Sequence, residues 1–248
     1  MKMRPHKIAL VTGANKGIGL ETVRQLARKG IHVLLGARDL DKAVAAAQPL
    51  IASGLLVEPI ELDVTNQTHI NSAVAIIAAK FGKLDILINN AGIMVESVDW
   101  SLNTSATVTP DILRKTYDTN FFGVVALTQA LLPLILNSPA GRIVNLSSIL
   151  GSLTFHAKPG SPIYDSKPFA YDSSKTALNA FTVHLAHALK DTSVKVNSAH
   201  PGWVKTDMGG EGATMDLVEG ASTSVELALL PADGPTAGYF HLGKPLPW

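Results

Sequence analysis

Short apolar runs alternate with longer amphipathic stretches along the chain, and this alternation restricts the fold more than any other feature. A short apolar run rich in branched residues predicts a strand, whereas apolar residues that recur every three or four positions predict a helix. Strands and helices in regular alternation favour a parallel sheet with right-handed crossovers. The pattern therefore predicts an α/β protein of three layers, built on a doubly wound parallel sheet of about seven strands.

Seven short segments carry the strand pattern, and those at 8–11, 31–35 and 84–88 are mostly apolar. The seven segments are Ile8–Val11, Ile31–Leu35, Ile60–Leu62, Leu84–Ile88, Arg142–Leu146, Val194–Ser198 and Tyr239–Phe240. Helical stripes extend from Ile70 to Phe81, before a stop at Gly82, and from Leu178 to Leu189. Thr109 and Pro110 are suited to cap and open another long helix. Because no repeat or linker divides the chain, residues 1–248 are expected to form one domain.

Three long segments lack a periodic pattern and are expected to be loops, roughly at 91–109, 150–170 and 201–221. All three leave the carboxyl ends of predicted strands. Ligands bind at these ends in open α/β sheets, and long loops in compact domains are often functional. We therefore expect the functional site to lie among these loops.

Composition excludes several classes of function. The 248 residues include no cysteine, which rules out disulfides, thiolate catalysis and cysteine-bound metals. The net charge of +1 gives no reason to expect nucleic acid or an anionic membrane as a partner, and no metal-binding cluster is visible. The longest apolar stretch, Val124–Leu136, is interrupted by Pro133 and polar residues, and the first apolar run is too short for a signal peptide. A cytoplasmic enzyme is expected.

The first predicted strand runs into a glycine-rich turn that precedes a helix. Its three glycines differ in spacing from the common dinucleotide-binding pattern, but they have the same physical use. Glycine permits a tight turn and a close approach of the pyrophosphate, which then lies at the helix N-terminus. The turn therefore favours a dinucleotide-binding Rossmann fold, although an ordinary glycine-rich turn is the alternative. The expected contacts are Gly13, Asn15, Lys16, Gly17, Ile18 and Gly19.

The end of the second strand favours NADPH over NADH. An NAD-binding unit usually carries an acid here for the ribose 2′-hydroxyl, whereas an arginine suits the 2′-phosphate of NADP. The strand ends in Ala37-Arg38, and the guanidinium of Arg38 offers a planar set of donors that matches a phosphate. Lys16 could add a second positive charge. The alternatives are that Arg38 is a solvated surface residue and that Asp39 only caps the next helix.

Tyr171 and Lys175 are spaced to lie on one face of a helix. A nearby ammonium would lower the pKa of the phenol and bring it closer to use as a general acid. A packed tyrosine beside a solvated lysine is the alternative reading. An upstream pair, Tyr164 and Lys167, is a decoy, because Pro168 keeps Lys167 out of a helix.

These motifs occur in the order found in short-chain dehydrogenases/reductases, and the chain resembles that family over nearly its whole length. The ordered set is Thr12-Gly13-x-x-x-Gly17-x-Gly19, Asp63-Val64, Asn89-Asn90-Ala91-Gly92, Asn120, Ser147-Ser148, Tyr171 with Lys175, and Pro201-Gly202-Trp203-Val204-Lys205-Thr206. The resemblance implies an NADP-binding Rossmann domain that transfers a hydride between NADPH and a carbonyl or alcohol.

The resemblance also implies catalytic roles for four residues. Tyr171 would protonate the carbonyl oxygen, and Lys175 would lower the pKa of the tyrosine and hold the nicotinamide ribose. Ser148, rather than Ser147, would hydrogen-bond the substrate oxygen, and Asn120 would hold a water in a proton relay. The four histidines His156, His184, His187 and His200 have no matching role and are expected at the surface or in packing.

Further cofactor contacts are implied at matching positions. Asp63 would contact the adenine, Asn90 the adenosine ribose and Thr206 the nicotinamide amide. The alternatives are an acid that caps a helix, a turn asparagine and a loop hydroxyl, respectively. The remaining contacts implied are Val64, Ala91, Gly92, Pro201, Gly202 and Val204, beside Tyr171 and Lys175.

Within the family the chain is most similar to the carbonyl reductase branch, on the residues Asn15-Lys16, Ala37-Arg38 and Pro201–Met208. It departs from the commonest family pattern in the spacing between the serine and the tyrosine. Tyr171 lies 23 positions after Ser148, whereas a separation of about a dozen is usual. In those reductases a longer insertion covers the helix face used for tetramers, so monomer and homo-oligomer both stay open.

The expected function is NADPH-dependent reduction of a small apolar ketone, aldehyde or quinone. The alternatives are an NADP-dependent alcohol dehydrogenase that works oxidatively and a non-catalytic NADP-binding sensor or interaction protein. Apolar residues of the long loops are candidates to line the pocket. They are Met94, Trp100, Phe155, Trp203 and Met208.

Overall fold

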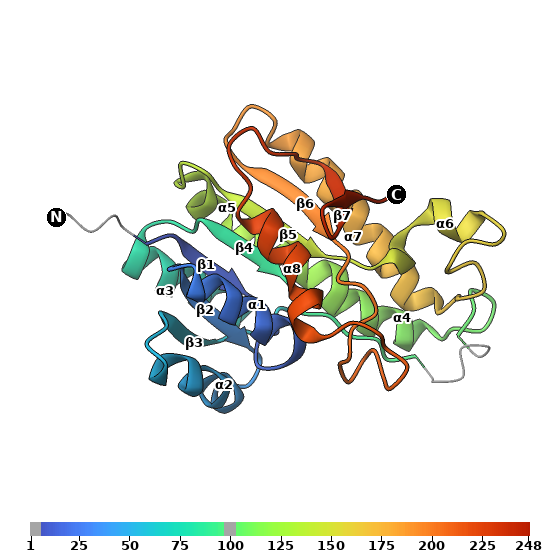
Figure 1. Cartoon of the computed structure of the whole chain (residues 1–248), viewed down its shortest axis with the longest axis horizontal. Helices are drawn as coiled ribbons and strands as arrows, with labels where there is room; N and C mark the ends of the chain where they lie inside the picture. Colours follow the sequence, from blue (N-terminus) through green and yellow to red (C-terminus); the bar gives the residue numbers. More distant parts are fainter. Residues whose placement is uncertain (1–5, 97–102) are drawn as a thin grey trace.

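One sheet of eight strands runs through the computed structural model, which describes residues 6–96 and 103–248 (Figure 1). The strands are β1 (Ile8–Val11), β2 (His32–Ala37), β3 (Val57–Glu61), β4 (Ile86–Asn89), β5 (Arg142–Leu146), β6 (Lys195–Ala199), β7 (Gly238–His241) and β8 (Lys244–Pro245). Their order is β3-β2-β1-β4-β5-β6-β7-β8, and only the pairing of β7 with β8 is antiparallel. The predicted doubly wound sheet is confirmed, with an added two-residue edge strand.

Helices and turns connect the strands. The helices are α1 (Gly17–Arg28), α2 (Leu40–Ala52), α3 (Gln67–Phe81), α4 (Pro110–Tyr117), α5 (Gly123–Leu136), α6 (Leu153–Ala157), α7 (Phe169–Ala188) and α8 (Leu217–Ala228). A π-helical turn, η2 (Asp118–Phe122), joins α4 to α5, and a 3₁₀ turn, η3 (Ile149–Gly151), follows β5.

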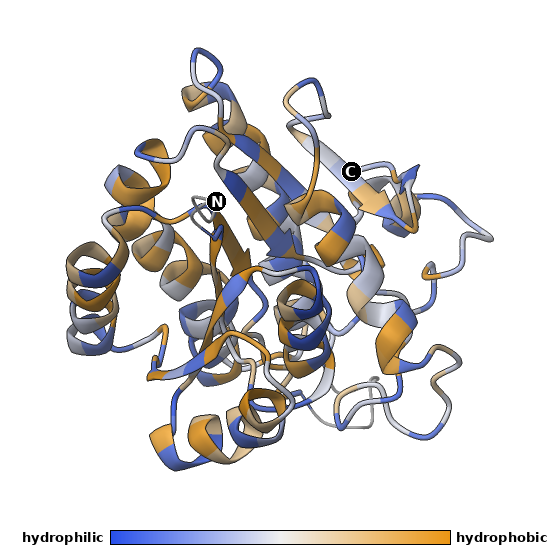
Figure 2. Cartoon of the chain, turned by 60° about the vertical axis from the view of Figure 1, so that its left-hand side comes forward, coloured by the Kyte–Doolittle hydropathy of each residue, from blue (hydrophilic) through white to orange (hydrophobic). Residues whose placement is uncertain are grey.

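Two apolar cores lie on opposite faces of the sheet. Val33 and Leu35 of β2 face the core that α1, α2 and α8 complete, whereas Leu34 faces the core completed by α3, α5 and α7. This alternation is the period of two that a strand imposes on its side chains. Figure 2 shows apolar colouring along the strands and on stretches of the helices. The sheet is therefore covered on both faces, as the apolar strand runs predicted.

Local sequence signals set several helix ends. Thr109 caps α4 by accepting a hydrogen bond from the backbone N–H of Ile112 (3.4 Å), and Pro110 occupies the first turn. Gly82 ends α3 in the left-handed conformation, with φ of 65°. Both ends are confirmed as predicted, because these residue types satisfy the terminal backbone groups.

The continuous segment Pro110–Leu136 is long and apolar enough to cross a membrane by length and composition alone. Several of its apolar side chains, however, pack inside the protein. Leu127, Leu131 and Ile135 are buried in the core that α3 and α7 share. The segment is therefore a core helix of this fold.

The direction of the crossover connections reverses between the neighbouring strands β1 and β4. A crevice forms outside the carboxyl ends of strands at such a point, and ligands bind there. The glycine-rich turn after β1 and the loop after β4 leave from this point. The predicted loop at 150–170 contains η3 and α6, which lie beside the N-terminal end of α7 (Figure 1).

Candidate active site

The glycine-rich turn carries β1 into the N-terminus of α1. Gly13 and Gly17 have φ of 60° and 57°, a left-handed conformation that glycine adopts without strain. The N-cap of α1 is Lys16, whose side chain has only donors, and the first turn contains no acid. The helix end therefore offers its backbone N–H groups and positive dipole to an anion, which fits a pyrophosphate.

Asn90 joins the end of β4 to this turn. Its amide nitrogen donates to the carbonyl oxygens of Thr12 (2.7 Å) and Gly13 (3.1 Å), while the Thr12 hydroxyl accepts from the N–H groups of Asn90 and Ala91. A Cβ on Gly19 would lie 2.5 Å from the Asn90 amide nitrogen, so only glycine fits at that position. Asn90 thus has the turn role that the sequence left open, and its ribose contact stays a prediction.

Positive charge lies at the edge of the expected cofactor site. Arg38 is exposed directly after β2, and Lys16 pairs with Asp207 at 2.5 Å, which links the glycine-rich turn to the loop after β6. Asp39 caps α2 by accepting from the N–H of Lys42 (3.1 Å). Its capping role is confirmed, so Asp39 needs no cofactor contact to explain it, and Arg38 is left as the group suited to a phosphate.

Other expected cofactor residues have structural contacts of their own. Asp63 accepts hydrogen bonds from the backbone N–H and hydroxyl of Thr65 (2.9 and 2.7 Å), whereas Asn66 is the residue that caps α3. The hydroxyl of Thr206 accepts from the N–H of Gly209 at 3.0 Å. The structure places both residues at the carboxyl ends of strands, and their contacts with a cofactor stay predictions. The remaining expected contacts lie in the connections that follow β3, β4 and β6. They are Val64, Gly92, Pro201, Gly202 and Val204.

Tyr171 and Lys175 lie in the first two turns of α7 and are both buried. The Lys175 Nζ donates to the carbonyl oxygen of Leu146 at the end of β5 (2.8 Å) and lies 5.5 Å from the centre of the Tyr171 ring. Ser148, two residues further along, lies close enough to the phenol for its hydroxyl to lower the pKa of Tyr171. The structure thus brings Ser148, Tyr171 and Lys175 together, as the sequence predicted.

Burial controls the titration of this pair. Burial raises the pKa of Tyr171 to about 12, an effect that the hydrogen bond from Ser148 opposes and that the carboxylates of Asp172 and Glu96 increase. Burial also lowers the pKa of Lys175 to about 8. The sequence led us to expect a lowered tyrosine pKa, and the structure gives the opposite, because desolvation of the buried phenolate is the largest effect on it. The phenol therefore keeps its proton near neutral pH and can donate it.

Asn120 lies in the π-helical turn η2, a kind of helix irregularity that is frequent at functional sites. Its side-chain oxygen accepts from the N–H of Ile93 (2.8 Å), and its nitrogen donates to the Ile93 carbonyl oxygen (2.8 Å) and to the Ser174 hydroxyl (3.1 Å). The side chain therefore connects the loop after β4 with α7. Its role in holding a water stays a prediction.

Three of the four histidines without a predicted role lie at the surface or in packing contacts, and the decoy lysine lies before α7. His184 and His187 are exposed, and Lys167 precedes α7, as expected. His200 is buried, and its Nδ1 accepts from the N–H of Ile149 at 3.1 Å, directly after Ser148. Burial and neighbouring His241 lower the pKa of His200 to about 3, so it is a neutral packing group. Among residues 6–96 and 103–248, no three His, Asp or Glu side chains are placed to hold a metal ion.

A charged cluster beside Tyr171 was missed by the sequence analysis. His156 of α6 places its Nε2 3.2 Å from Asp172 Oδ2, and its Nδ1 contacts the Lys167 Nζ at 3.0 Å. Burial and the carboxylate of Glu96 raise the pKa of Asp172 to about 8, which Lys167 opposes. Glu96 is 75 positions from Tyr171 in the sequence. No local pattern joins these residues, so only the fold reveals the cluster.

The raised pKa of Asp172 predicts a stability that depends on pH. A carboxyl whose folded pKa exceeds its unfolded value stabilises the fold at low pH, and this contribution is lost as pH rises from about 4 to about 8. Asp172→Asn keeps an acceptor for His156 but removes the ionisation. We expect the free energy of unfolding of the variant to exceed that of the wild type by up to about 5 kcal/mol at pH 8, because each unit of the shift corresponds to about 1.4 kcal/mol, and to show no advantage at pH 4. Urea unfolding at the two pH values tests this, and an equal difference at both would contradict it.

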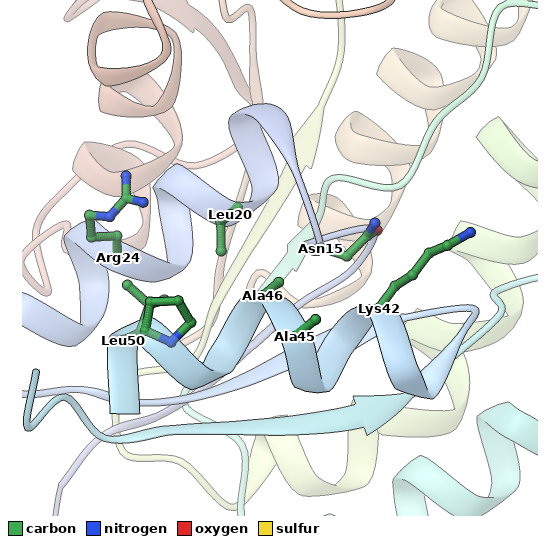
Figure 3. Close-up of a pocket in the computed structure, with 8 residues that line it drawn as sticks. Asn15, Leu20, Arg24, Lys42, Ala45, Ala46 and Leu50 are labelled. Carbon is green, nitrogen blue, oxygen red and sulfur yellow. The ribbon is translucent and has the colours of Figure 1, made fainter. Parts of the chain in front are cut away.

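Neither of two hollows on the surface is lined by the expected catalytic side chains. Figure 3 shows a shallow one between α1 and α2, beside the glycine-rich turn, with Asn15, Arg24 and Lys42 at its edges and apolar residues between. Of the apolar side chains expected to line a substrate pocket, Met94 and Phe155 are half-buried, while Trp203 and Met208 are 57% and 47% exposed. Trp100 lies outside the described residues.

Comparison with known proteins extends these findings. A family model described as short chain dehydrogenase matches residues 7–216. Short-chain dehydrogenase/reductase 1 of Saponaria officinalis is 35% identical, with 98% of this chain and 96% of the relative covered. Carbonyl reductase (NADPH) 1 of Mus musculus is 34% identical over 97% of this chain and 98% of its own length. The crystal structure of NADPH-bound carbonyl reductase from chicken fatty liver superposes with a TM-score of 0.84 at 27% identity, covering 99% of this chain and 100% of that one.

Proposed function

The chain belongs to the short-chain dehydrogenase/reductase family, and we propose that it reduces a carbonyl group to an alcohol with NADPH. The observation that carries the proposal is the buried phenol of Tyr171, which lies beside Ser148 and Lys175 at the carboxyl end of β5. A tyrosine that holds its proton at neutral pH is suited to the reductive direction, in which the carbonyl oxygen must receive one. The carbonyl reductases among its relatives support this choice.

The residues fit NADPH as the cofactor. The N-terminus of α1 would hold the pyrophosphate, Arg38 and Lys16 the 2′-phosphate, and Asn90 and Asp63 the adenosine. Bound NADPH supplies a hydride to the carbonyl carbon. Residues 1–248 would act as one NADP-binding domain, which the continuous sheet from β1 to β8 supports.

Each catalytic side chain has a defined task in this proposal. Ser148 donates a hydrogen bond to the carbonyl oxygen and polarises it. Tyr171 gives its proton to that oxygen as negative charge develops there, which completes the alcohol. Lys175, held by the Leu146 carbonyl oxygen, stabilises the phenolate that is left and binds the nicotinamide ribose. Asn120 would hold a water through which the phenolate regains its proton.

The substrate would be small and apolar. Large apolar side chains are exposed in the loops that leave the carboxyl ends of β5 and β6, and they are Leu153 (62%), Trp203 (57%) and Met208 (47%). Apolar side chains that remain exposed beside a polar site suggest a binding surface. A cytoplasmic location stays a prediction, as does the choice between monomer and homo-oligomer.

The test is NADPH consumption on a panel of quinones, aromatic aldehydes and cyclic ketones. We expect turnover of at least one class, with no consumption in the absence of carbonyl. Faster conversion of the matching alcohols with NADP⁺ at neutral pH would favour the oxidative alternative. Tight NADPH binding without turnover in either direction would contradict the proposal and favour a non-catalytic NADP-binding protein.

A further inference from the structure

Glu96, in the loop after β4, caps the helix that carries the catalytic tyrosine. Its Oε1 accepts a hydrogen bond from the backbone N–H of Tyr171 at 2.9 Å. The N-cap position of α7 is Pro168, whose side chain cannot accept this bond, and Tyr171 is the third residue of the helix. The N–H of a third residue is the one that a capping side chain ordinarily satisfies. Glu96 therefore supplies from a distant segment the cap that α7 lacks locally.

The same loop contacts other catalytic groups. A Cβ on Gly92 would lie 3.4 Å from the Lys175 Nζ and 3.5 Å from the Asn120 side-chain oxygen, so the backbone passes close to both. Ile93 exchanges two hydrogen bonds with Asn120. The segment from Gly92 to Glu96 thus extends along the site from Lys175 and Asn120 to Tyr171. Its beginning is also where the cofactor is expected.

The contact is made at a cost, which argues that the carboxylate is there for this contact. The second oxygen of Glu96, Oε2, is buried and has no hydrogen-bond partner among the described residues. Burying an unpaired carboxylate oxygen is unfavourable. The charge of Glu96 also disfavours ionisation of the nearby Asp172 carboxyl, whose pKa is raised to about 8 by burial and by this charge. A residue chosen only for stability at this position would avoid both penalties.

We propose that Glu96 is a positioning residue, which fixes the first turn of α7 against the loop after β4 and so sets the place of the Tyr171 phenol. The proposal rests on the proposed function for its effect on catalysis, although the contact itself is independent of any substrate. The Tyr171 hydroxyl must meet both Ser148 and the carbonyl oxygen. A displacement of a catalytic group by about 1 Å can cost a large factor in rate.

Three substitutions separate the effect of the length of the Glu96 side chain from the effect of its charge. Glu96→Gln keeps an acceptor oxygen at the same distance but removes the charge, whereas Glu96→Asp keeps the charge and shortens the side chain. Glu96→Ala removes both. We expect kcat to fall about tenfold in the Asp and Ala variants, while the KM for NADPH changes by less than about twofold. In the Gln variant we expect kcat to equal that of the wild type.

Asp216→Ala is the matched control, because Asp216 caps α8 in the same way. It accepts from the N–H of Glu219, the third residue of α8, at 2.8 Å. We expect this variant to lose stability without the fall in kcat. An equal fall in kcat in Asp216→Ala, or wild-type kcat in Glu96→Asp and Glu96→Ala, would overturn the proposal.

Hydrogen exchange separates this proposal from the proposed function. We expect the amides of residues 169–172 to exchange faster in Glu96→Asp and Glu96→Ala than in the wild type and Glu96→Gln. If the wild type reduces no carbonyl, the proposed function fails, but this exchange pattern still decides whether Glu96 fixes the turn. Unchanged exchange in all three variants would overturn the positioning role, whatever the wild-type activity.

Discussion

Replacing Tyr171 by phenylalanine is expected to lower the rate of carbonyl reduction by about 100- to 10,000-fold, the range that general acid catalysis contributes. The change removes one hydroxyl and keeps the ring that fills the space beside Lys175. NADPH binding should persist, because the groups expected to hold its phosphates lie at the glycine-rich turn and Arg38. Single-turnover measurement of NADPH oxidation with the best substrate of the panel, beside fluorescence titration of NADPH, tests both parts.

Tyr164→Phe is the control for this change, because it removes the same hydroxyl from the decoy pair. Tyr164 is 38% exposed and lies before α7. We expect its activity to equal that of the wild type. A Tyr171→Phe enzyme that retained more than about a tenth of the wild-type rate would require another proton donor. A matching loss in both variants would point to a general effect on the fold.

The elements of the fold followed from the sequence because their signals are local. The apolar strands of the sheet, the stop at Gly82 and the opening at Thr109 and Pro110 each depend on residues adjacent in the chain. The third strand was predicted to begin three residues too late, because its first three residues, Val57-Glu58-Pro59, are partly polar and include a proline. The sheet tolerates this proline because β3 is its edge strand. The edge strand β8 was missed because two residues give no period.

In the candidate site, too, features with a local sequence signal were predicted, and features that depend on distant contacts were not. The spacing of Tyr171 and Lys175 and the glycine-rich turn can be read from short stretches of sequence, and the structure brings them to one end of the sheet. The tyrosine pKa could not be read in this way, because it depends on how deeply the phenol is buried. The contacts of Glu96 and Asp172 were not predicted from the sequence for a related reason. Their significance comes from contacts between segments that only the folded chain brings together.

Arg38→Asp is expected to exchange the cofactor preference. We expect the KM for NADPH to rise about 100-fold, because the change replaces charge-assisted hydrogen bonds to the 2′-phosphate with repulsion. The KM for NADH should change by only a few fold, since a carboxylate at this position can accept from the ribose 2′-hydroxyl. Steady-state kinetics with both cofactors and one carbonyl substrate would measure the two effects side by side.

Arg28→Asp controls for the change in net charge, because Arg28 is exposed at the opposite end of α1 from the glycine-rich turn. It should leave the ratio of NADPH to NADH efficiency unchanged, since charges separated by more than a screening length interact weakly. Equal losses with both cofactors in Arg38→Asp would mean that Arg38 is a solvated surface residue. The preference would then have to depend on another group. Lys16 would be the first to replace, because both it and its present partner Asp207 are exposed to solvent, so that Asp207 could release it to a phosphate.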